Sequence, residues 1–352
     1  MIVAGAGVTI ENGGCVQTDS FAGYAQGTYH LDAKWSLTLG GRYTKDDKTA
    51  NVYRFMYLGF KHPRQSANKI ATQSDFNGDE SFSHFSPRLG VEYQANDQLM
   101  WYGSYTDGFK SGGFDMRGNQ QLNPKANEPY QPETVDTVEF GVKSEWLDRR
   151  LRLNAAVFSS SYDDMQVTVQ RAVGNNVASQ VLNAASADIN GAELEAIAVA
   201  SEALQFNLIV GYTDASFNEV MFYDPTTKTT TDVSGLWSFA NTPELTATLG
   251  SKYSMALAGG ELVFTASMAY RSETQIFELP SLLDSGGYTL FNAGATWYAP
   301  DGSWDVSLQG RNIGDKLVRI AGYNFPLLAG EQTITAYYAD PATVSLSVGY
   351  RF

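Results

Sequence analysis

The chain has 352 residues, only 18% of them charged, and it is rich in aromatic residues and glycine, with 20 Tyr, 19 Phe, 6 Trp and 33 Gly. This composition favours many strands joined by turns over a helical bundle. The formal net charge of −14 argues against a nucleic-acid partner, because phosphate binding needs a basic face. Cys15 is the only cysteine, which excludes an intrachain disulfide and a thiolate metal cluster.

Short runs in which apolar and polar side chains alternate recur from Ser20 to the C-terminus. Each has about the 9–11 residues that a tilted strand needs to cross a bilayer, whereas no segment approaches the ~18 apolar residues of a membrane helix. The alternation predicts thirteen antiparallel strands and an all-β fold. In chain order we expect them at 18–30, 33–45, 82–94, 98–108, 133–146, 149–165, 187–199, 203–216, 243–254, 261–272, 287–298, 303–313 and 342–352.

The predicted connections alternate strictly in length. Short turns rich in turn-forming residues fall at 31–33, 95–97, 147–149, 200–202, 256–260 and 299–302. Long polar connections occupy 46–81, 109–132, 166–186, 217–242, 273–286 and 314–341. Short turns on one side and long loops on the other are typical of an outer-membrane β-barrel whose long loops face outside.

The two faces of the predicted strands differ in polarity. In the strand at 203–216, Leu208 and its apolar neighbours Leu204, Phe206, Val210 and Tyr212 oppose a mostly polar row that includes Asn207. Aromatic residues gather at the ends of such apolar rows, as they do at the two interfaces of a membrane. A soluble sandwich is the alternative, but its core has no reason to sort aromatic residues to strand ends. We therefore predict an antiparallel transmembrane β-barrel.

The chain stops on an aromatic residue. Residues 343–352 alternate in polarity, and the apolar row ends with Tyr350 and Phe352. This ending resembles the signal by which bacterial outer-membrane barrels are assembled. It implies that Tyr350 and Phe352 are read by the barrel-assembly machinery.

Eight short segments, in order and correctly spaced, resemble the C-terminal part of the TonB-dependent receptors, outer-membrane transporters that import scarce nutrients. They lie at 86–93, 105–114, 132–143, 150–158, 183–185, 191–195, 311–316 and 349–352. The family resemblance implies a 22-stranded barrel filled by an N-terminal plug. Only thirteen strands are predicted here, and no plug segment is present in the sequence.

This difference predicts a partial barrel. We expect residues 1–17 to be the remnant of an extracellular loop or a partial strand, and 18–352 to be the C-terminal part of the barrel. The start lacks a secretory signal, so we expect Met1 to begin a fragment. Two edge strands of an odd set run the same way, so antiparallel closure is not expected. Alternatively, residues 2–10 supply a fourteenth strand, although glycine and alanine weaken that possibility.

Candidate ligand contacts lie in the predicted outer loops. Aromatic rings offer rigid apolar area with polar handles for a small ligand, and nearby cations attract an anionic chelate. The candidates are Phe109, Phe114, Tyr223, Trp237, Arg271, Tyr323, Phe325 and Tyr337. Lys316 and Arg319 lie close to the same mouth. The alternative is that these rings only pack the loops on one another.

Nothing in the sequence indicates catalysis, a metal site or a cofactor. His30, His62 and His84 show no metal-ligand spacing, and no Ser/His/Asp set lies at compatible strand heights. Four glutamates are predicted on the inner face, where they contact a plug, stay hydrated or meet a passing cation; they are Glu92, Glu139, Glu193 and Glu195. We therefore predict that the protein is not an enzyme.

The resemblance implies a receptor in the outer membrane of a Gram-negative bacterium. In its complete form it would actively import a scarce nutrient, such as an iron–siderophore-like or other small ligand. Implied partners are outer-membrane lipid, lipopolysaccharide, the small ligand, and the TonB energy-coupling complex acting through the plug. A passive pore or structural barrel is the alternative, and an outer-membrane hydrolase is a third. Ferric siderophores, cobalamin, thiamine-like compounds and oligosaccharides all remain possible cargoes.

Overall fold

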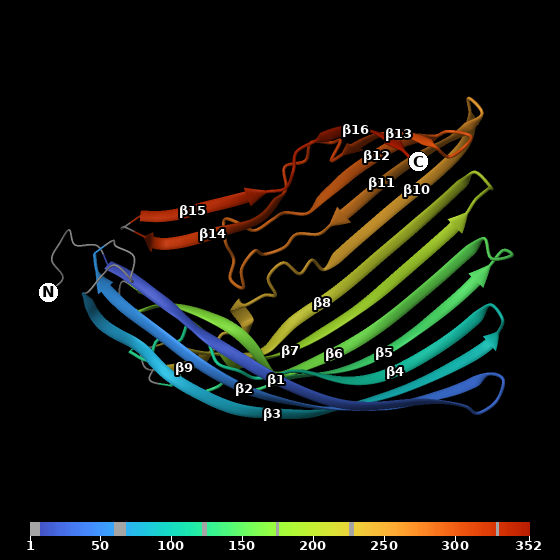
Figure 1. Cartoon of the computed structure of the whole chain (residues 1–352). Helices are drawn as coiled ribbons and strands as arrows, with labels where there is room; N and C mark the ends of the chain where they lie inside the picture. The colour runs from blue at the N-terminus through green and yellow to red at the C-terminus, as the bar shows by residue number, and fades with distance from the viewer. Residues whose placement is uncertain (1–7, 60–67, 122–124, 174–175, 225–228, 329–330) are drawn as a thin grey trace.

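One antiparallel sheet makes up most of the protein. The computed structural model describes residues 8–59, 68–121, 125–173, 176–224, 229–328 and 331–352. Thirteen strands follow one another in the order β1-β2-β3-β4-β5-β6-β7-β8-β10-β11-β12-β13-β16, and β9 pairs with β8 alone. Figure 1 shows this sheet curling from β1 at one edge to β16 at the other, so that it forms an open trough.

The strands of the main sheet are β1 (Val8–His30), β2 (Trp35–Leu58), β3 (Lys69–Asn96), β4 (Leu99–Lys110), β5 (Glu133–Trp146), β6 (Leu151–Val173), β7 (Asn176–Val199), β8 (Leu204–Asp224), β9 (Thr229–Asp232), β10 (Leu245–Leu257), β11 (Gly260–Arg271), β12 (Tyr288–Tyr298), β13 (Trp304–Arg311) and β16 (Thr343–Tyr350). A separate hairpin consists of β14 (Arg319–Leu328) and β15 (Glu331–Tyr338). The helix described is a single 3-10 turn, η2 (Ser234–Leu236). In the described part of the chain, no helix has the length and apolar character needed to cross a membrane.

The thirteen predicted strands are confirmed, but several are longer than predicted. β2 continues to Leu58 and β3 begins at Lys69, so most of the predicted loop 46–81 is strand. The predicted loop 166–186 is likewise mostly extensions of β6 and β7, whereas in the predicted loop 217–242 only the part up to Asp224 extends β8. The sequence did not reveal the full length of these strands because polar residues interrupt the alternation at several points. For example, Asn51 Nδ2 donates to Asn77 Oδ1 across β2 and β3 at 2.9 Å, and such pairs leave no alternation to detect.

The short connections are tight turns held by local hydrogen bonds. Between β1 and β2, Asp32 Oδ1 accepts the backbone N–H groups of Lys34 and Trp35, each at 2.7 Å. These two bonds hold the pKa of the Asp32 carboxyl below its ordinary value. Between β12 and β13, Asp301 Oδ1 accepts from the Ser303 backbone at 3.0 Å. Aspartate side chains therefore close both turns by completing backbone bonds that the strands leave open.

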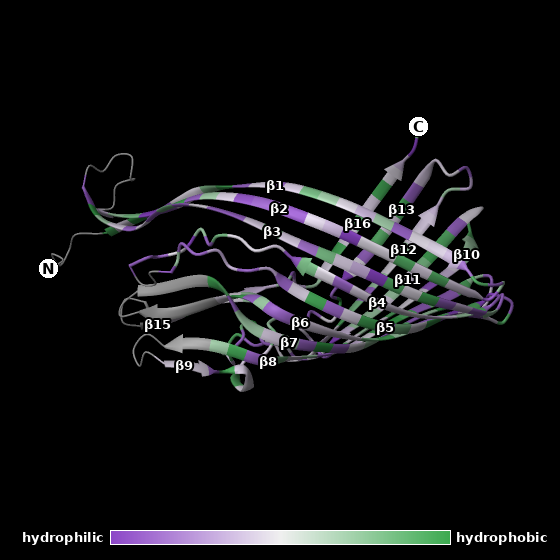
Figure 2. Ribbon diagram, turned by 90° about the horizontal axis from the view of Figure 1, so that it is seen from below, coloured by the Kyte–Doolittle hydropathy of each residue, from purple (hydrophilic) through white to green (hydrophobic). Residues whose placement is uncertain are grey.

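The strand register sorts side chains into outward and inward rows. Residues directly opposite one another share a face, and the outward rows carry Trp35 beside Tyr93 with ring centroids 4.5 Å apart, and Trp304 beside Tyr350 at 4.6 Å. Figure 2 shows hydrophobic and hydrophilic positions alternating along the strands. Leu346, at 69% exposed, belongs to an outward row with no second sheet over it. The sandwich alternative is therefore wrong, because a sandwich would bury this row.

The two edges of the sheet do not pair with each other. β16 hydrogen-bonds to β13 from Thr343 to Tyr350, and β1 pairs only with β2, so the described strands show no ladder across the seam. This confirms the predicted open seam. Val8 and Ile10 belong to β1, where Val8 lies opposite Leu58. The alternative of a separate fourteenth strand at 2–10 is therefore wrong for its described residues, and 1–7 lie outside the described part.

Replacing Leu208 by arginine should destabilise the folded barrel far more than the same change at Asn207. Leu208 lies opposite Leu249 in an outward row, whereas Asn207 lies opposite Gly250 in an inward row. A charge on the lipid face near the bilayer centre costs roughly 2–4 kcal/mol, and a charge facing a wet interior costs little. The measurement is a folding titration of the complete barrel in lipid vesicles. Equal costs at the two positions would show that the assigned faces are incorrect.

Candidate functional site

A folded segment, described at residues 111–121 and 125–132, lies against the inner face of the sheet at its long-loop end. The Phe114 ring is buried there against Val52 and Phe76, in a cluster that also includes Ala50 and Met116. Ser74 Oγ donates to the Gly118 carbonyl at 2.7 Å and accepts the Gln120 backbone N–H at 3.0 Å. We call residues 111–121 and 125–132 the inner segment. Its first half is thus fixed to β2 and β3 by apolar packing and by backbone hydrogen bonds.

Asp115 ties the inner segment to the opposite strands. Asp115 is only 6% exposed, and one oxygen of its carboxylate accepts the Val181 backbone N–H from β7 at 2.6 Å. The other oxygen accepts from Arg117 Nε at 3.1 Å. Arg117 in turn donates to Thr168 Oγ1 of β6 at 3.5 Å. Because a buried carboxylate must be paired, this cluster links β2 and β3 to β6 and β7 through the inner segment.

Two amide side chains, those of Asn183 and Gln166, hydrogen-bond to the two ends of the inner segment. Asn183 Oδ1 accepts the Gln131 backbone N–H at 2.6 Å, and Asn183 Nδ2 donates to the carbonyls of Gln131 at 2.8 Å and Asp164 at 2.7 Å. Gln166 Nε2 donates to the carbonyls of Ser111 at 3.1 Å and Gln131 at 3.0 Å. One residue from β6 and one from β7 thereby close both ends of the segment. These bonds hold the inner segment in place inside the mouth of the trough.

The two predicted ligand-contact residues at the start of this region have packing partners. Phe109, half-buried at the end of β4, stacks on the His84 ring with centroids 4.7 Å apart. His84 Nε2 lies 2.5 Å from Asp107 Oδ1. Phe114 is 6% exposed, so its ring is covered while the inner segment stays docked. These two positions illustrate the packing alternative that the sequence left open.

Trp237 and Arg271 hold a second region of the mouth together. Trp237 contacts the Phe217 ring edge-on at 6.1 Å, and Phe217 stacks on Phe239 at 4.2 Å. Arg271 Nη2 donates to the Asn241 carbonyl at 2.7 Å. Its Nε is buried and has no hydrogen-bond partner among the described residues. Both predicted residues lie at the mouth: Trp237 directly follows η2, and Arg271 bonds Asn241 of the same segment.

Among the predicted ligand contacts whose side chains are described, the most exposed lie on the β14–β15 hairpin. Tyr323 and Tyr337 are 53% and 49% exposed, and their rings meet edge-on at 5.9 Å. Arg319 anchors the hairpin by donating to the carbonyls of Leu282 at 2.8 Å and Asp284 at 2.9 Å. Leu283, 1% exposed, packs against Gly322 of β14. The side chains of Tyr223 and Phe325 lie outside the described part of the structure.

Partial burial perturbs a few tyrosines at this end. The pKa of Tyr130 in the inner segment is raised mainly by burial and, to a smaller extent, by the nearby Asp115 carboxylate. Burial, and then a hydrogen bond to Glu11, raise the pKa of Tyr57 in the extension of β2. Both hydroxyls therefore stay neutral at physiological pH, and the Tyr57 hydroxyl donates to Glu11 Oε2 at 2.9 Å.

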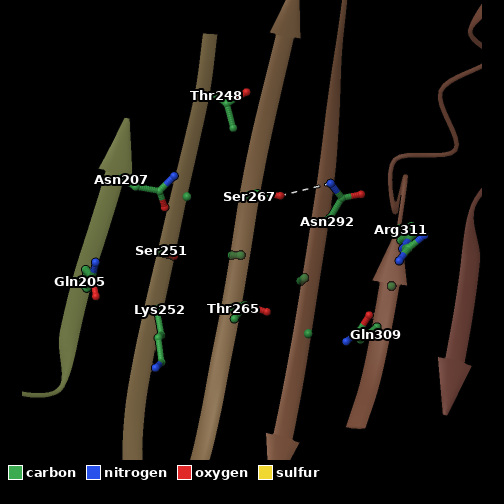
Figure 3. A pocket seen from close by; sticks show the side chains of 15 residues that line it. Gln205, Asn207, Thr248, Ser251, Lys252, Thr265, Ser267, Asn292, Gln309 and Arg311 are labelled. Carbon is green, nitrogen blue, oxygen red and sulfur yellow. Dashed lines mark hydrogen bonds between the residues drawn. The ribbon is translucent and has the colours of Figure 1, made fainter. Parts of the chain in front are cut away.

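A polar hollow lies on the inner wall formed by β8 and β10–β13. Its volume is about 540 Å³, and amide, hydroxyl and cationic side chains line it. Figure 3 shows Asn207, Lys252, Asn292, Gln309 and Arg311 around it, with Asn292 Nδ2 donating to Ser267 Oγ at 3.2 Å. Among the described residues, no three His, Cys, Asp or Glu side chains gather as a metal site requires. His62 lies outside the described part.

Sequence reasoning missed the residues that fix the inner segment. Asn183 stood in a recognised motif without an assigned role, and Asp115 and Gln166 were not singled out. The sequence carries only a weak indication of this role, because an Asn or Gln in a strand beyond the lipid is usually a solvated surface residue. Only the fold shows that these side chains meet a backbone that would otherwise lack partners.

Apolar rows turned outward and polar rows turned inward place this sheet among the transmembrane β-barrels of outer membranes. The chain belongs to the family described as TonB dependent receptor-like, beta-barrel, whose model matches residues 5–313. Its location is therefore the outer membrane of a Gram-negative bacterium, and the long-loop end is the extracellular mouth. The family consists of transport receptors and not of enzymes.

Several relatives resemble the chain over much of its length. A ferric-pyoverdine M114 receptor, PbuA, of Pseudomonas sp. strain M114 is 25% identical over 282 residues, which cover 79% of this chain and 30% of that protein. The pesticin receptor of Yersinia enterocolitica is 27% identical over 188 residues, covering 53% and 24%. The ferric yersiniabactin uptake receptor FyuA from Yersinia pestis shares the fold, with a TM-score of 0.75 and 19% identity, over 97% of this chain and 47% of that one. The chain spans less than half of each relative.

Replacing Asn183 by alanine should release the end of the inner segment. The change removes the acceptor of the Gln131 N–H and both donated bonds, each worth about 1 kcal/mol. Hydrogen–deuterium exchange of the protein in detergent micelles should show faster exchange at residues 125–132. Asn218→Ala is the matched control, because Asn218 bonds Asp188 on the neighbouring strand. Unchanged exchange at 125–132 in Asn183→Ala would show that Asn183 does not hold the segment.

Proposed function

We propose that this chain is the C-terminal part of an outer-membrane receptor that actively imports a scarce nutrient, in particular an iron-chelate-like ligand. In this proposal residues 18–352 supply part of the barrel wall and the mouth, and residues 1–17 belong to its extracellular rim. The family match over residues 5–313 is the observation that carries the proposal. The names of the relatives add support, because two of them take ferric pyoverdine and ferric yersiniabactin as ligands.

The residues of this chain supply binding and positioning, and no covalent step is required. Tyr323 and Tyr337 offer exposed ring surface at the mouth, where an organic chelate gains apolar contact area. The inner segment narrows the entrance without depending on the ligand, because Asp115 and Asn183 hold it in place. The proposed partners are a plug, the TonB energy-coupling complex acting through it, outer-membrane lipid and lipopolysaccharide.

The test is energy-dependent uptake by cells that produce the complete receptor. Cells lacking other iron receptors are offered the ⁵⁵Fe complexes of pyoverdine, yersiniabactin and a catecholate one at a time. We expect saturable uptake of at least one complex, and a protonophore should abolish it while leaving surface binding intact. A passive pore would instead admit the complex without saturation and without sensitivity to the protonophore.

Two tyrosine variants test the location of ligand binding. In the complex that is taken up, Tyr323→Ala combined with Tyr337→Ala should weaken surface binding because the pair loses its exposed ring area. Tyr337→Phe keeps the ring and is the matched control. Equal binding by the double variant and the wild type would place the ligand elsewhere at the mouth.

Deleting Phe352 should impair assembly in cells, where we propose that the machinery reads the terminal aromatic residue. The Phe352 side chain is fully exposed, and its ring lies edge-on to Tyr350 at 4.9 Å, beyond the last pair of the β13–β16 ladder. Membrane-inserted receptor is measured in cells and, separately, after spontaneous refolding into detergent. A loss confined to cells supports recognition, whereas equal losses would show that the ring contributes only packing.

A further inference from the structure

We propose that an anionic metal chelate crosses the barrel along the inner wall of β8 and β10–β13, where Lys252 and Arg311 bind it in passage. This inference rests on the proposed import function and names the side of the barrel that the ligand follows. It depends on the shape of the polar hollow, on the charges that line it, and on the contrast with the wall formed by β4–β7.

The hollow exists because glycines in the inward rows are covered only by thin side chains. A Cβ atom at Gly250 would lie 2.3 Å from Asn207 Oδ1, and one at Gly294 would lie 3.1 Å from Thr265 Oγ1. An amide and a hydroxyl thus rest flat against the strands, which leaves the volume of about 540 Å³ above them. The wall is recessed and polar, and it offers many hydrogen-bond donors and acceptors to a hydrated solute.

The two charges that line the hollow have one sign, whereas Glu261 and Asp305 stand in inward rows of the same wall nearer the short turns. Lys252 and Arg311 line the hollow and no carboxylate does. Lys252 lies opposite Gln205, near the short-turn end of β8, whereas Arg311 lies opposite Thr343 at the end of β13 nearer the mouth. Both are exposed, and neither has an ion-pair partner among the described residues. Two unpaired cations at different depths form a path for an anion, because low-dielectric walls focus their field.

The wall of β4–β7 has the opposite character. Aromatic rings fill it, since a Cβ atom at Gly141 would lie 2.4 Å from the Tyr102 ring and one at Gly191 would lie 2.3 Å from the Phe158 ring. Near the middle of this wall the inward rows also carry three carboxylates and one lysine, which are Glu139, Glu193, Glu195 and Lys143. Nearer the short turn, Glu145 and Arg152 form an ion pair with each other. An anion is repelled there and has less room, so the recessed wall is the favoured side.

The decisive variant reverses both charges of the hollow in the complete receptor, as Lys252→Glu with Arg311→Glu. The probe is whichever ⁵⁵Fe complex the wild type imports, compared among pyoverdine, yersiniabactin and catecholate complexes. We expect the maximal uptake rate per receptor to fall about fivefold or more, with surface binding in protonophore-treated cells unchanged. Lys252→Arg with Arg311→Lys keeps both charges and should retain uptake.

A charge reversal on the other wall is the matched control. Glu193→Lys with Glu195→Lys changes the same number of charges in inward rows and should not lower uptake. The inference is overturned if the hollow variant imports at the wild-type rate, or if both reversals lower uptake equally.

The rival occupant of the hollow is a plug. In that case Lys252→Glu with Arg311→Glu should lower the receptor level in the outer membrane or admit vancomycin, and either result would overturn the inference. Absence of wild-type uptake for every complex would refute the proposed function itself. Wild-type uptake that the hollow variant retains refutes only the assigned path.

Discussion

Backbone hydrogen bonding between neighbouring strands is the constraint on which this structure depends, because hydrocarbon offers no other partner for peptide groups. The antiparallel ladders from β1 to β16 meet that need at every internal strand. They also fix which residues share a face, so Leu208 and Leu249 point outward while Asn207 and Gly250 point inward. At the outer edges of β1 and β16 the described strands leave the same constraint unmet, because these two strands do not pair with each other.

Beyond the lipid, the strands continue as polar ladders and side chains take over the stabilising role. The inner segment has almost no regular structure of its own, so its peptide groups bond to the side chains of Ser74, Gln166 and Asn183. In the other direction, its Asp115 carboxylate accepts the Val181 backbone N–H of β7. A mouth built in this way is rigid on the side of β2, β3, β6 and β7. The β14–β15 hairpin is attached differently, through the Arg319 guanidinium and the buried Leu283 side chain.

The interior of the barrel is not uniform, and its asymmetry follows from what covers the glycines of each wall. Rings lie over Gly141 and Gly191, whereas amide and hydroxyl groups lie over Gly250 and Gly294. The first wall is therefore filled, and the second is recessed and basic. Such a difference matters to any charged solute, because a low-dielectric wall strengthens the field of each charge that it carries.

The sequence by itself determined the strands and their facing, because alternation is a local property that one strand displays alone; Leu208 beside Asn207 is sufficient to define both rows. It could not show how far β2 and β3 extend past the lipid, since polar pairs such as Asn51 and Asn77 leave no alternation. Nor could it tell a packed ring from an exposed one, as at Phe114. Only the tertiary structure determined how the mouth is held together. Asn183 bonds Gln131, which is 52 residues away in the chain, and no local sequence pattern joins the two.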